Sequence, residues 1–170
     1  GRVKKLENGK IRILVAPMVI DRSSQIAGVD DVFNGILVRG DATGDVVFYG
    51  KGAGKLPTAS AVVADVIDCV KHFAARKYLF WSDADPDYVD DYKNDETAVL
   101  VHVSAADPTL ALQQVRDVFG EIRLLARKNE APGEFAFATG VMTEHKIDEK
   151  LDALRKQEIV VYNCLRISDF

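Results

Sequence analysis

Hydrophobic and polar positions along the chain follow two periods, the alternation of a β-strand and the roughly 3.6-residue spacing of an α-helix. Together they predict an α+β fold. Residues 10–20 begin with alternating apolar and polar positions and continue as a solid apolar run, a pattern typical of a strand. Two further β-rich runs, residues 33–41 and 45–50, are joined by the three-residue connection 42–44, which contains a glycine. Because strands joined by a short glycine-containing connection usually pair with each other, these two runs predict a β-hairpin.

The period changes to that of a helix after the hairpin. Pro57 suits the first turn of a helix, where its missing N–H group is not needed. Apolar side chains then recur at helical spacing, at Val62, Val63, Val66, Ile67, Val70 and Phe73. We therefore expect an amphipathic helix over residues 57–76 with one buried face.

The region from residue 98 onward has its own order of elements. Strand patterns cover residues 98–104, 121–128, 134–141 and 159–167, and helical patterns cover residues 109–119 and 146–157. This β-α-β-β-α-β order predicts the split βαβ, or ferredoxin-like, arrangement. The preceding residues 78–97 are acidic and have no clear period, so we expect a linker or domain boundary there.

Composition and charge narrow the classes of function. The chain has 170 residues, of which 48% are hydrophobic and 28% charged, as in soluble globular domains. A net charge of −4 argues against a nucleic-acid or anionic-membrane partner, because both need an excess of Lys and Arg. Cys69 and Cys164 are too few for a disulfide framework, so we expect a cytoplasmic protein. The first residue is not Met, from which we expect a piece of a longer protein.

The most distinctive motif is the glycine-rich run YGKGAGKLPTAS at residues 49–60. A phosphate-binding P-loop places Lys and then Ser or Thr after its last glycine, but here Lys55 is followed by Leu56. The dinucleotide fingerprint G-x-G-x-x-G follows the first strand of a βαβ unit, whereas this G-x-G-x-G follows a hairpin. Two interpretations remain open. The run is either a tight strand-to-helix turn or bare backbone that lets another group approach a helix N-terminus.

Residues 28–68 closely resemble homoserine dehydrogenase, a family with a segment of the form VFN…V.GD..G…FYG.GAG..PTA.AV..D just after its catalytic core. The C-terminal half is similar, by element order, to an ACT domain, a small regulatory βαββαβ module that often follows this enzyme. The resemblance implies three parts: residues 1–77 as the hairpin and helix of the catalytic domain, residues 78–97 as an acidic linker, and residues 98–170 as a ferredoxin-like ACT domain.

The resemblance implies a parent activity, the NAD- or NADP-dependent interconversion of aspartate semialdehyde and homoserine on the route to threonine, methionine and isoleucine. The family's Rossmann half, its catalytic Asp and Lys, its substrate-binding Glu and its alkali-metal site lie upstream of the matching segment. We therefore expect no catalytic residue and no metal ligand in this chain, and no dehydrogenase activity from the chain alone.

The glycine run is the cofactor-facing piece that the resemblance retains. Matched position by position, Gly54 is the residue for which the resemblance implies contact with the cofactor, and Gly52 and Ala53 are neighbouring positions. We expect a side chain at Gly54 to fill space that the cofactor occupies.

The ACT-like half departs from its family pattern at SAADPTLAL, residues 104–112, where Pro108 or Thr109 stands in place of an expected glycine. Asp107 is a candidate cap for the following helix. An amino-acid effector such as threonine therefore remains one alternative, and a module that only pairs subunits remains another. A stand-alone ACT module is a further alternative to an enzyme fragment. Since an open sheet has edges, we expect a homo-oligomer.

The remaining chemistry-bearing side chains are interpreted as structural or solvated rather than as ligands. They are Cys69, His72, His102 and His145.

Overall fold

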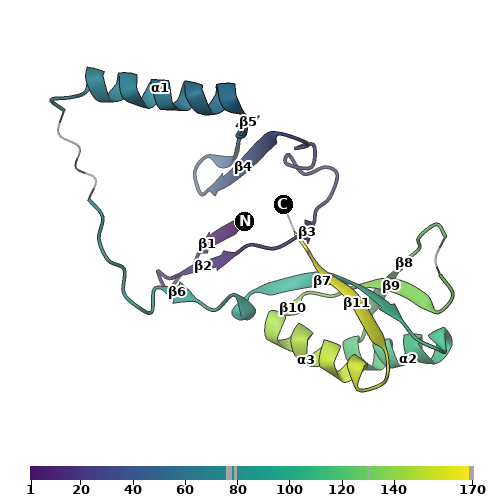
Figure 1. Ribbon diagram of the computed structural model, residues 1–170. Coiled ribbons are helices and arrows are strands. Elements are labelled where there is room, and N and C mark those ends of the chain that lie inside the picture. The colour runs from purple at the N-terminus through teal and green to yellow at the C-terminus, as the bar shows by residue number, and fades with distance from the viewer. Residues whose placement is uncertain (76–77, 79, 130, 169–170) are drawn as a thin grey trace. The chain divides into compact units, whose positions relative to one another are not determined.

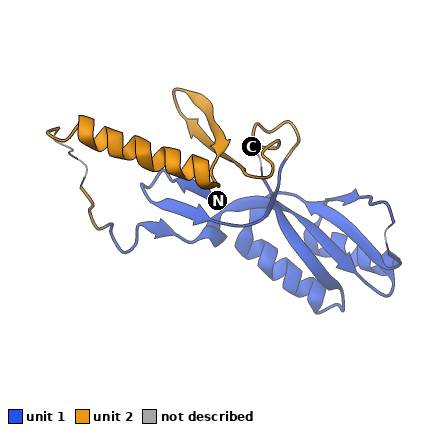
Figure 2. Ribbon diagram, turned by 45° about the horizontal axis from the view of Figure 1, so that its top comes forward, with its two compact units in different colours: residues 1–20, 84–169 blue, residues 21–83, 170 orange. Residues whose placement is uncertain are grey.

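The computed structural model describes residues 1–75, 78, 80–129 and 131–168. Two compact units are present (Figure 2). One comprises residues 1–20 and the described residues from 84 onward, and the other comprises the described residues between 21 and 83. No helix in the described ranges is long and apolar enough to cross a membrane.

The first unit is built on a six-stranded sheet (Figure 1). Its strands are β3 (Met18–Val19), β7 (Glu96–Ser104), β8 (Ile122–Leu125), β9 (Glu134–Thr139), β10 (Met142–Thr143) and β11 (Val160–Ile167). The order is β3-β11-β7-β9-β8, with β10 paired to β7 outside this path. Strand β3 runs parallel to β11, and the other pairs are antiparallel.

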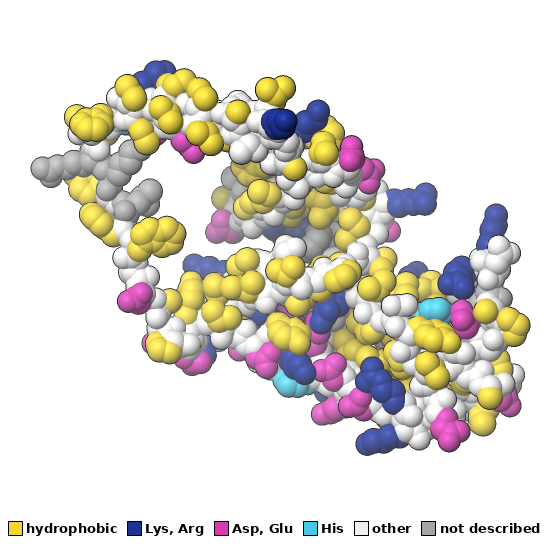
Figure 3. Space-filling view, viewed as in Figure 1, with side chains coloured by type: hydrophobic (Ala, Val, Ile, Leu, Met, Phe, Trp, Pro, Cys, Tyr) yellow, Lys and Arg dark blue, Asp and Glu magenta, His cyan; other side chains and the backbone are white. Residues whose placement is uncertain are grey.

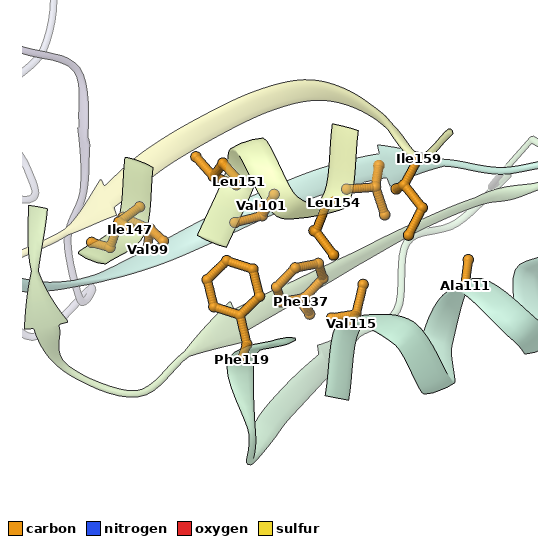
Figure 4. Close-up of a cluster of buried hydrophobic side chains, with 11 residues drawn as sticks. Val99, Val101, Ala111, Val115, Phe119, Phe137, Ile147, Leu151, Leu154 and Ile159 are labelled. Carbon is orange, nitrogen blue, oxygen red and sulfur yellow. The ribbon is translucent and has the colours of Figure 1, made fainter. Parts of the chain in front are cut away.

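Two helices, α2 (Pro108–Phe119) and α3 (Glu144–Arg155), pack on one face of this sheet. Strand β7 alternates buried and half-buried residues, so its buried valines, Val99, Val101 and Val103, all point to the helices. They meet Phe137 of β9 and side chains such as Leu154 of α3 in one apolar cluster (Figure 4). Since burial of such a face drives folding, this cluster is the core of the unit.

The order β7, α2, β8, β9, α3, β11 agrees with the order that the sequence patterns predict. Helix α2 begins one residue earlier than expected, at Pro108, because Asp107 caps it. The Asp107 carboxylate accepts hydrogen bonds from the backbone N–H groups of Thr109 at 2.9 Å and Leu110 at 3.1 Å. The predicted cap is therefore present.

Replacing Asp107 with alanine is expected to destabilise this unit by about 1 kcal/mol, because two N–H groups of the first helical turn lose their acceptor. Thermal unfolding of the 170-residue chain measures the effect. Asp107→Asn keeps an acceptor oxygen and is expected to stay close to the unchanged protein. An asparagine variant as unstable as the alanine variant would contradict the capping role.

The expected single strand at residues 10–20 is instead divided between two sheets. Strand β2 (Ile11–Leu14) pairs with β1 (Arg2–Lys5) and with β6 (Val89–Asp90) in a three-stranded sheet, while β3 joins the larger sheet. Pro17 directly precedes β3, and it has no N–H group with which to continue a ladder. The chain therefore passes from the three-stranded sheet to the larger sheet between Leu14 and Met18.

Part of the segment expected to be a linker, residues 78–97, is ordered secondary structure. It contains β6, the 3₁₀ turn η1 (Tyr92–Asn94) and the first residues of β7. Its acidic side chains explain this, because Asp90 and Asp95 pair with arginines of the N-terminal strands. Residues 1–20 therefore belong to the same compact unit as the described residues from 84 onward, and the division of the chain into three parts stays a prediction.

Asp95 is the centre of that ion-pair cluster and is 4% exposed. Its carboxylate pairs with Arg2, with Arg12 at 2.9 Å and with Lys4 at 3.6 Å. The Arg12 guanidinium also hydrogen-bonds Asp90, which holds the pKa of the Asp90 carboxyl below its ordinary value. These contacts join β1 and β2 to the start of β7.

The second unit contains a hairpin and a helix. Strands β4 (Phe33–Gly40) and β5 (Gly44–Lys51) pair antiparallel in full register, from Phe33 opposite Lys51 to Gly40 opposite Gly44. The predicted hairpin is therefore confirmed. Helix α1 (Lys55–Lys71) begins two residues before the expected Pro57 and ends earlier than expected. The predicted end at residue 76 lies outside the described residues.

The prediction of a buried face on this helix is wrong for the described chain. No residue of α1 is buried, and its apolar side chains, such as Val66 at 57% and Val70 at 72%, are exposed (Figure 3). The amphipathic pattern specifies an apolar stripe, but it does not specify which chain supplies the surface that covers it.

Candidate functional site

The glycine loop links the end of β5 to the start of α1. Residues 52–54 lie between Lys51, the last residue of the strand, and Lys55, the first residue of the helix. The structure therefore places Gly52, Ala53 and Gly54 in one strand-to-helix turn, all in the second unit.

Gly54 has a backbone conformation that only glycine adopts without strain, with φ 124° and ψ 154°. Its carbonyl accepts the first bond of the helix, from the N–H group of Thr58 at 3.1 Å. A Cβ added here meets Pro57 at ordinary contact distances of 3.4 and 3.7 Å. The need for glycine at this position is therefore conformational, and the turn interpretation accounts for it.

Gly52 lies where an added side chain would displace the side chain of Asn34. A Cβ added at Gly52 overlaps Nδ2 of Asn34 and lies 2.9 Å from its Cγ. Asn34 comes from β4, opposite Gly50 in the hairpin register, so the loop folds back against the hairpin. Sequence analysis missed Asn34, although its place in the VFN triplet of the family segment was a usable signal.

The hairpin supports the loop with an aromatic stack. The rings of Phe33 and Tyr49 are parallel, with centroids 4.9 Å apart, and the Lys51 ammonium lies 5.6 Å from the Phe33 centroid. The stack sits at the open end of the hairpin, beside the first residue of the loop. Such cross-strand aromatic pairs stabilise a hairpin, here at the end from which the loop leaves.

At the helix side, the first turn of α1 has no side-chain cap and no acidic residue. Pro57 contributes no N–H group there, and Lys55 adds a positive charge. An uncapped helix N-terminus beside bare glycine backbone suits an anionic or carbonyl-bearing group. The residues present therefore fit a contact with a nicotinamide cofactor through backbone rather than through side chains.

Two of the remaining histidines contact carboxylates of their own units. Nδ1 of His72 lies 2.9 Å from Asp68 on the surface of α1, and His102 contacts Glu134 in the other unit. Burial raises the pKa of the Cys164 thiol, which keeps it protonated. Within the described ranges, no group of His, Cys, Asp or Glu side chains is arranged to hold a metal ion.

Comparisons with known proteins point to one family. A family model described as homoserine dehydrogenase matches residues 1–67. A homoserine dehydrogenase from Synechocystis sp. is 52% identical over 60 residues, covering 35% of this chain and 14% of that protein. One from Pseudomonas aeruginosa is 30% identical over 161 residues, covering 88% of this chain and 37% of that protein.

Solved structures carry the same name. A homoserine dehydrogenase from Thiobacillus denitrificans is similar with a TM-score of 0.72 and 26% identity, covering 98% of this chain and 41% of that chain. A homoserine dehydrogenase from S. aureus is similar with a TM-score of 0.64 and 27% identity, covering 96% of this chain and 40% of that chain. The chain thus spans less than half the length of each of these proteins. Since family model, sequence relatives and solved structures agree, the chain is a partial segment of the homoserine dehydrogenase family.

Proposed function

We propose that this chain is part of a homoserine dehydrogenase that interconverts L-aspartate 4-semialdehyde and L-homoserine with NADP or NAD. The reaction belongs to the biosynthesis of threonine, methionine and isoleucine. In this proposal the chain supplies a cofactor-contacting loop, a scaffold for a dimer and a regulatory module, in the cytoplasm. The chain alone is inactive, because the family's catalytic and nucleotide-binding residues have no counterpart in it.

The observation that carries the proposal is the glycine turn inside the matched segment. Gly54 holds a conformation that other residues adopt only with strain, and it lies within residues 1–67. The bound cofactor supplies the hydride chemistry, while this loop's part is to offer backbone N–H and carbonyl groups without a side chain in the way. Gly52 and Ala53 shape the approach to that backbone.

Gly54→Val in the full-length enzyme is expected to raise the KM for the nicotinamide cofactor by roughly tenfold, because the valine side chain would stand between the cofactor and the backbone groups of the turn. The KM for homoserine is expected to change much less. Steady-state kinetics with each substrate varied in turn measure both constants, and thermal unfolding reports whether the fold is kept.

Gly50→Ala is the matched control. Gly50 lies in β5, four residues before Gly54, and a Cβ added there meets nothing within 4 Å. We expect this variant to keep both KM values. If Gly54→Val folds and also keeps its cofactor KM, the glycine serves the turn alone and the cofactor contact is wrong.

We further propose that residues 98–170 form an ACT-like module of the ferredoxin-like type, following an acidic segment at 78–97 and a catalytic-domain segment at 1–77. The strand order β11-β7-β9-β8 with both helices on one face supports this. Strand β8 lies at the edge of the sheet, where a second copy can pair with it.

A module that only pairs subunits is the second candidate. Pro108 and the Asp107 cap occupy the turn where the family pattern has a glycine open to an amino-acid effector, and this favours pairing over sensing. Calorimetry with threonine separates the two, since heat of binding at millimolar ligand supports a sensor and its absence supports pairing.

A further inference from the structure

The face of the six-stranded sheet that points away from α2 and α3 has its own composition. On β7, Leu100 and His102 alternate with the core valines and so lie on this second face. In the register, Leu100 stands between Ala138 and Leu165, and His102 stands between Ala136 and Asn163. We call the hollow that these rows border the open-face pocket.

The open-face pocket has a volume of about 290 Å³. Its floor is apolar, formed by Leu100, Leu125, Ala136 and Leu165 from four neighbouring strands. A volume of this size is at the lower end of sites that bind small molecules, about 300 Å³. The pocket therefore suits a small branched or aromatic body.

Polar side chains also line the pocket, namely His102, Arg127 and Asn163. Nε2 of His102 lies 3.1 Å from a carboxylate oxygen of Glu134, and one guanidinium nitrogen of Arg127 lies 3.4 Å from the same oxygen. The His102 and Glu134 side chains are 20% and 19% exposed, whereas Arg127 is 58% exposed. The histidine and the carboxylate thus form a sheltered pair, with the arginine at its outer edge.

The charges at this edge favour an anion. Arg127 carries five N–H donors, and its contact with Glu134 is long and uses one nitrogen. His102 and Arg127 both contact the Glu134 carboxylate, so its negative charge is partly compensated. Among the described residues, Arg127 keeps N–H donors beyond the one that contacts Glu134, and an anion can accept hydrogen bonds from them.

We propose that the open-face pocket binds a small carboxylate with a branched or aromatic apolar body. The body rests on the leucine floor, and the carboxylate accepts hydrogen bonds from Arg127. The pocket lies on the sheet face, apart from the β7–α2 turn where an ACT resemblance would place an effector. It is independent of the dehydrogenase activity proposed above.

The test is an amide-resolved NMR titration of the 170-residue chain with 4-methylpentanoate. Saturable shifts are expected at Leu100, Ala136 and Leu165. The matching amide, 4-methylpentanamide, has the same apolar body without the charge and is expected to bind about tenfold more weakly, since the charge-assisted bonds are lost.

Two variants sharpen the result. Arg127→Gln is expected to weaken binding of the acid about tenfold and to leave binding of the amide unchanged. Arg116→Gln, an exposed arginine on α2, makes the same change of charge away from the pocket and is expected to have no effect.

Three outcomes would overturn the proposal. One is equal binding of the acid and the amide, which would remove the role of the charge. Another is the absence of saturable shifts on this face. The third is shifts that follow protein concentration instead of ligand, together with a dimer in sedimentation, which would assign the face to a second copy of the chain.

Discussion

Replacing Phe137 with alanine is expected to lower the free energy of unfolding of the first unit by about 3–5 kcal/mol, the usual cost of truncating a buried phenylalanine. Phe137 is 0% exposed. Its ring meets Phe119 of α2 edge to face at a centroid distance of 5.5 Å, and it stands opposite Val101 in the sheet. Alanine leaves a cavity between sheet and helices that neighbouring side chains fill only in part. Urea unfolding followed by circular dichroism, with amide exchange of β7, measures the loss.

Leu124→Ala provides the control for this experiment. Leu124 is the register partner of Phe137 on β8, but it is 46% exposed. Its truncation removes fewer contacts and is expected to cost less than about 1 kcal/mol. Equal losses for the two variants would contradict the placement of Phe137 at the centre of the core.

Replacing Asp95 with alanine is expected to cost about 3 kcal/mol, the lower end of what removing one partner of a buried ion pair costs. Arg2 and Arg12 would lose the carboxylate that neutralises them, and their own side chains are only 22% and 13% exposed. The loss is moderated because Arg12 keeps Asp90. Amide exchange is expected to rise most in β1 and β2, since Asp95 holds these strands to β7.

The exposed pair Lys10–Asp87 provides the matched comparison. Nζ of Lys10, the residue just before β2, lies 2.6 Å from a carboxylate oxygen of Asp87 in the acidic segment, but the Asp87 side chain is 83% exposed. Solvent screens such pairs, so Asp87→Ala is expected to leave the exchange of β1 and β2 nearly unchanged. A similar rise in exchange for both variants would show that Asp95 has no special role as the anchor.

Much of the fold could be predicted because its signals are local. The alternation around Val101 predicts a strand and the helical spacing along α2 and α3 predicts helices, each from a short stretch of the chain. The structure has these elements in the expected order. The same holds for the Asp107 cap, whose partners are two and three residues away. The strand at residues 10–20 was wrong in part, because nothing local states that β2 and β3 join different sheets.

The strand-to-helix turn could be predicted from the glycine run, and Gly52, Ala53 and Gly54 do form one turn. Their contact with a cofactor stays a prediction. The structure adds a backbone conformation at Gly54 that favours glycine. It also adds the proximity of Gly52 to the side chain of Asn34, which is 18 positions earlier in the chain and which no local pattern indicates.

The sequence by itself determined the strand and helix periods, the Asp107 cap, the hairpin and the family, because each depends on neighbouring residues or on a contiguous motif. Only the tertiary structure decided which acidic residues pair with which arginines, which strand joins which sheet, and that the stripe on α1 finds no cover among the described residues of this chain. The physical reason is that these outcomes depend on groups far apart in the chain, such as Arg2 and Asp95, 93 positions apart. Their proximity is set by how whole sheets pack, and no local pattern encodes it.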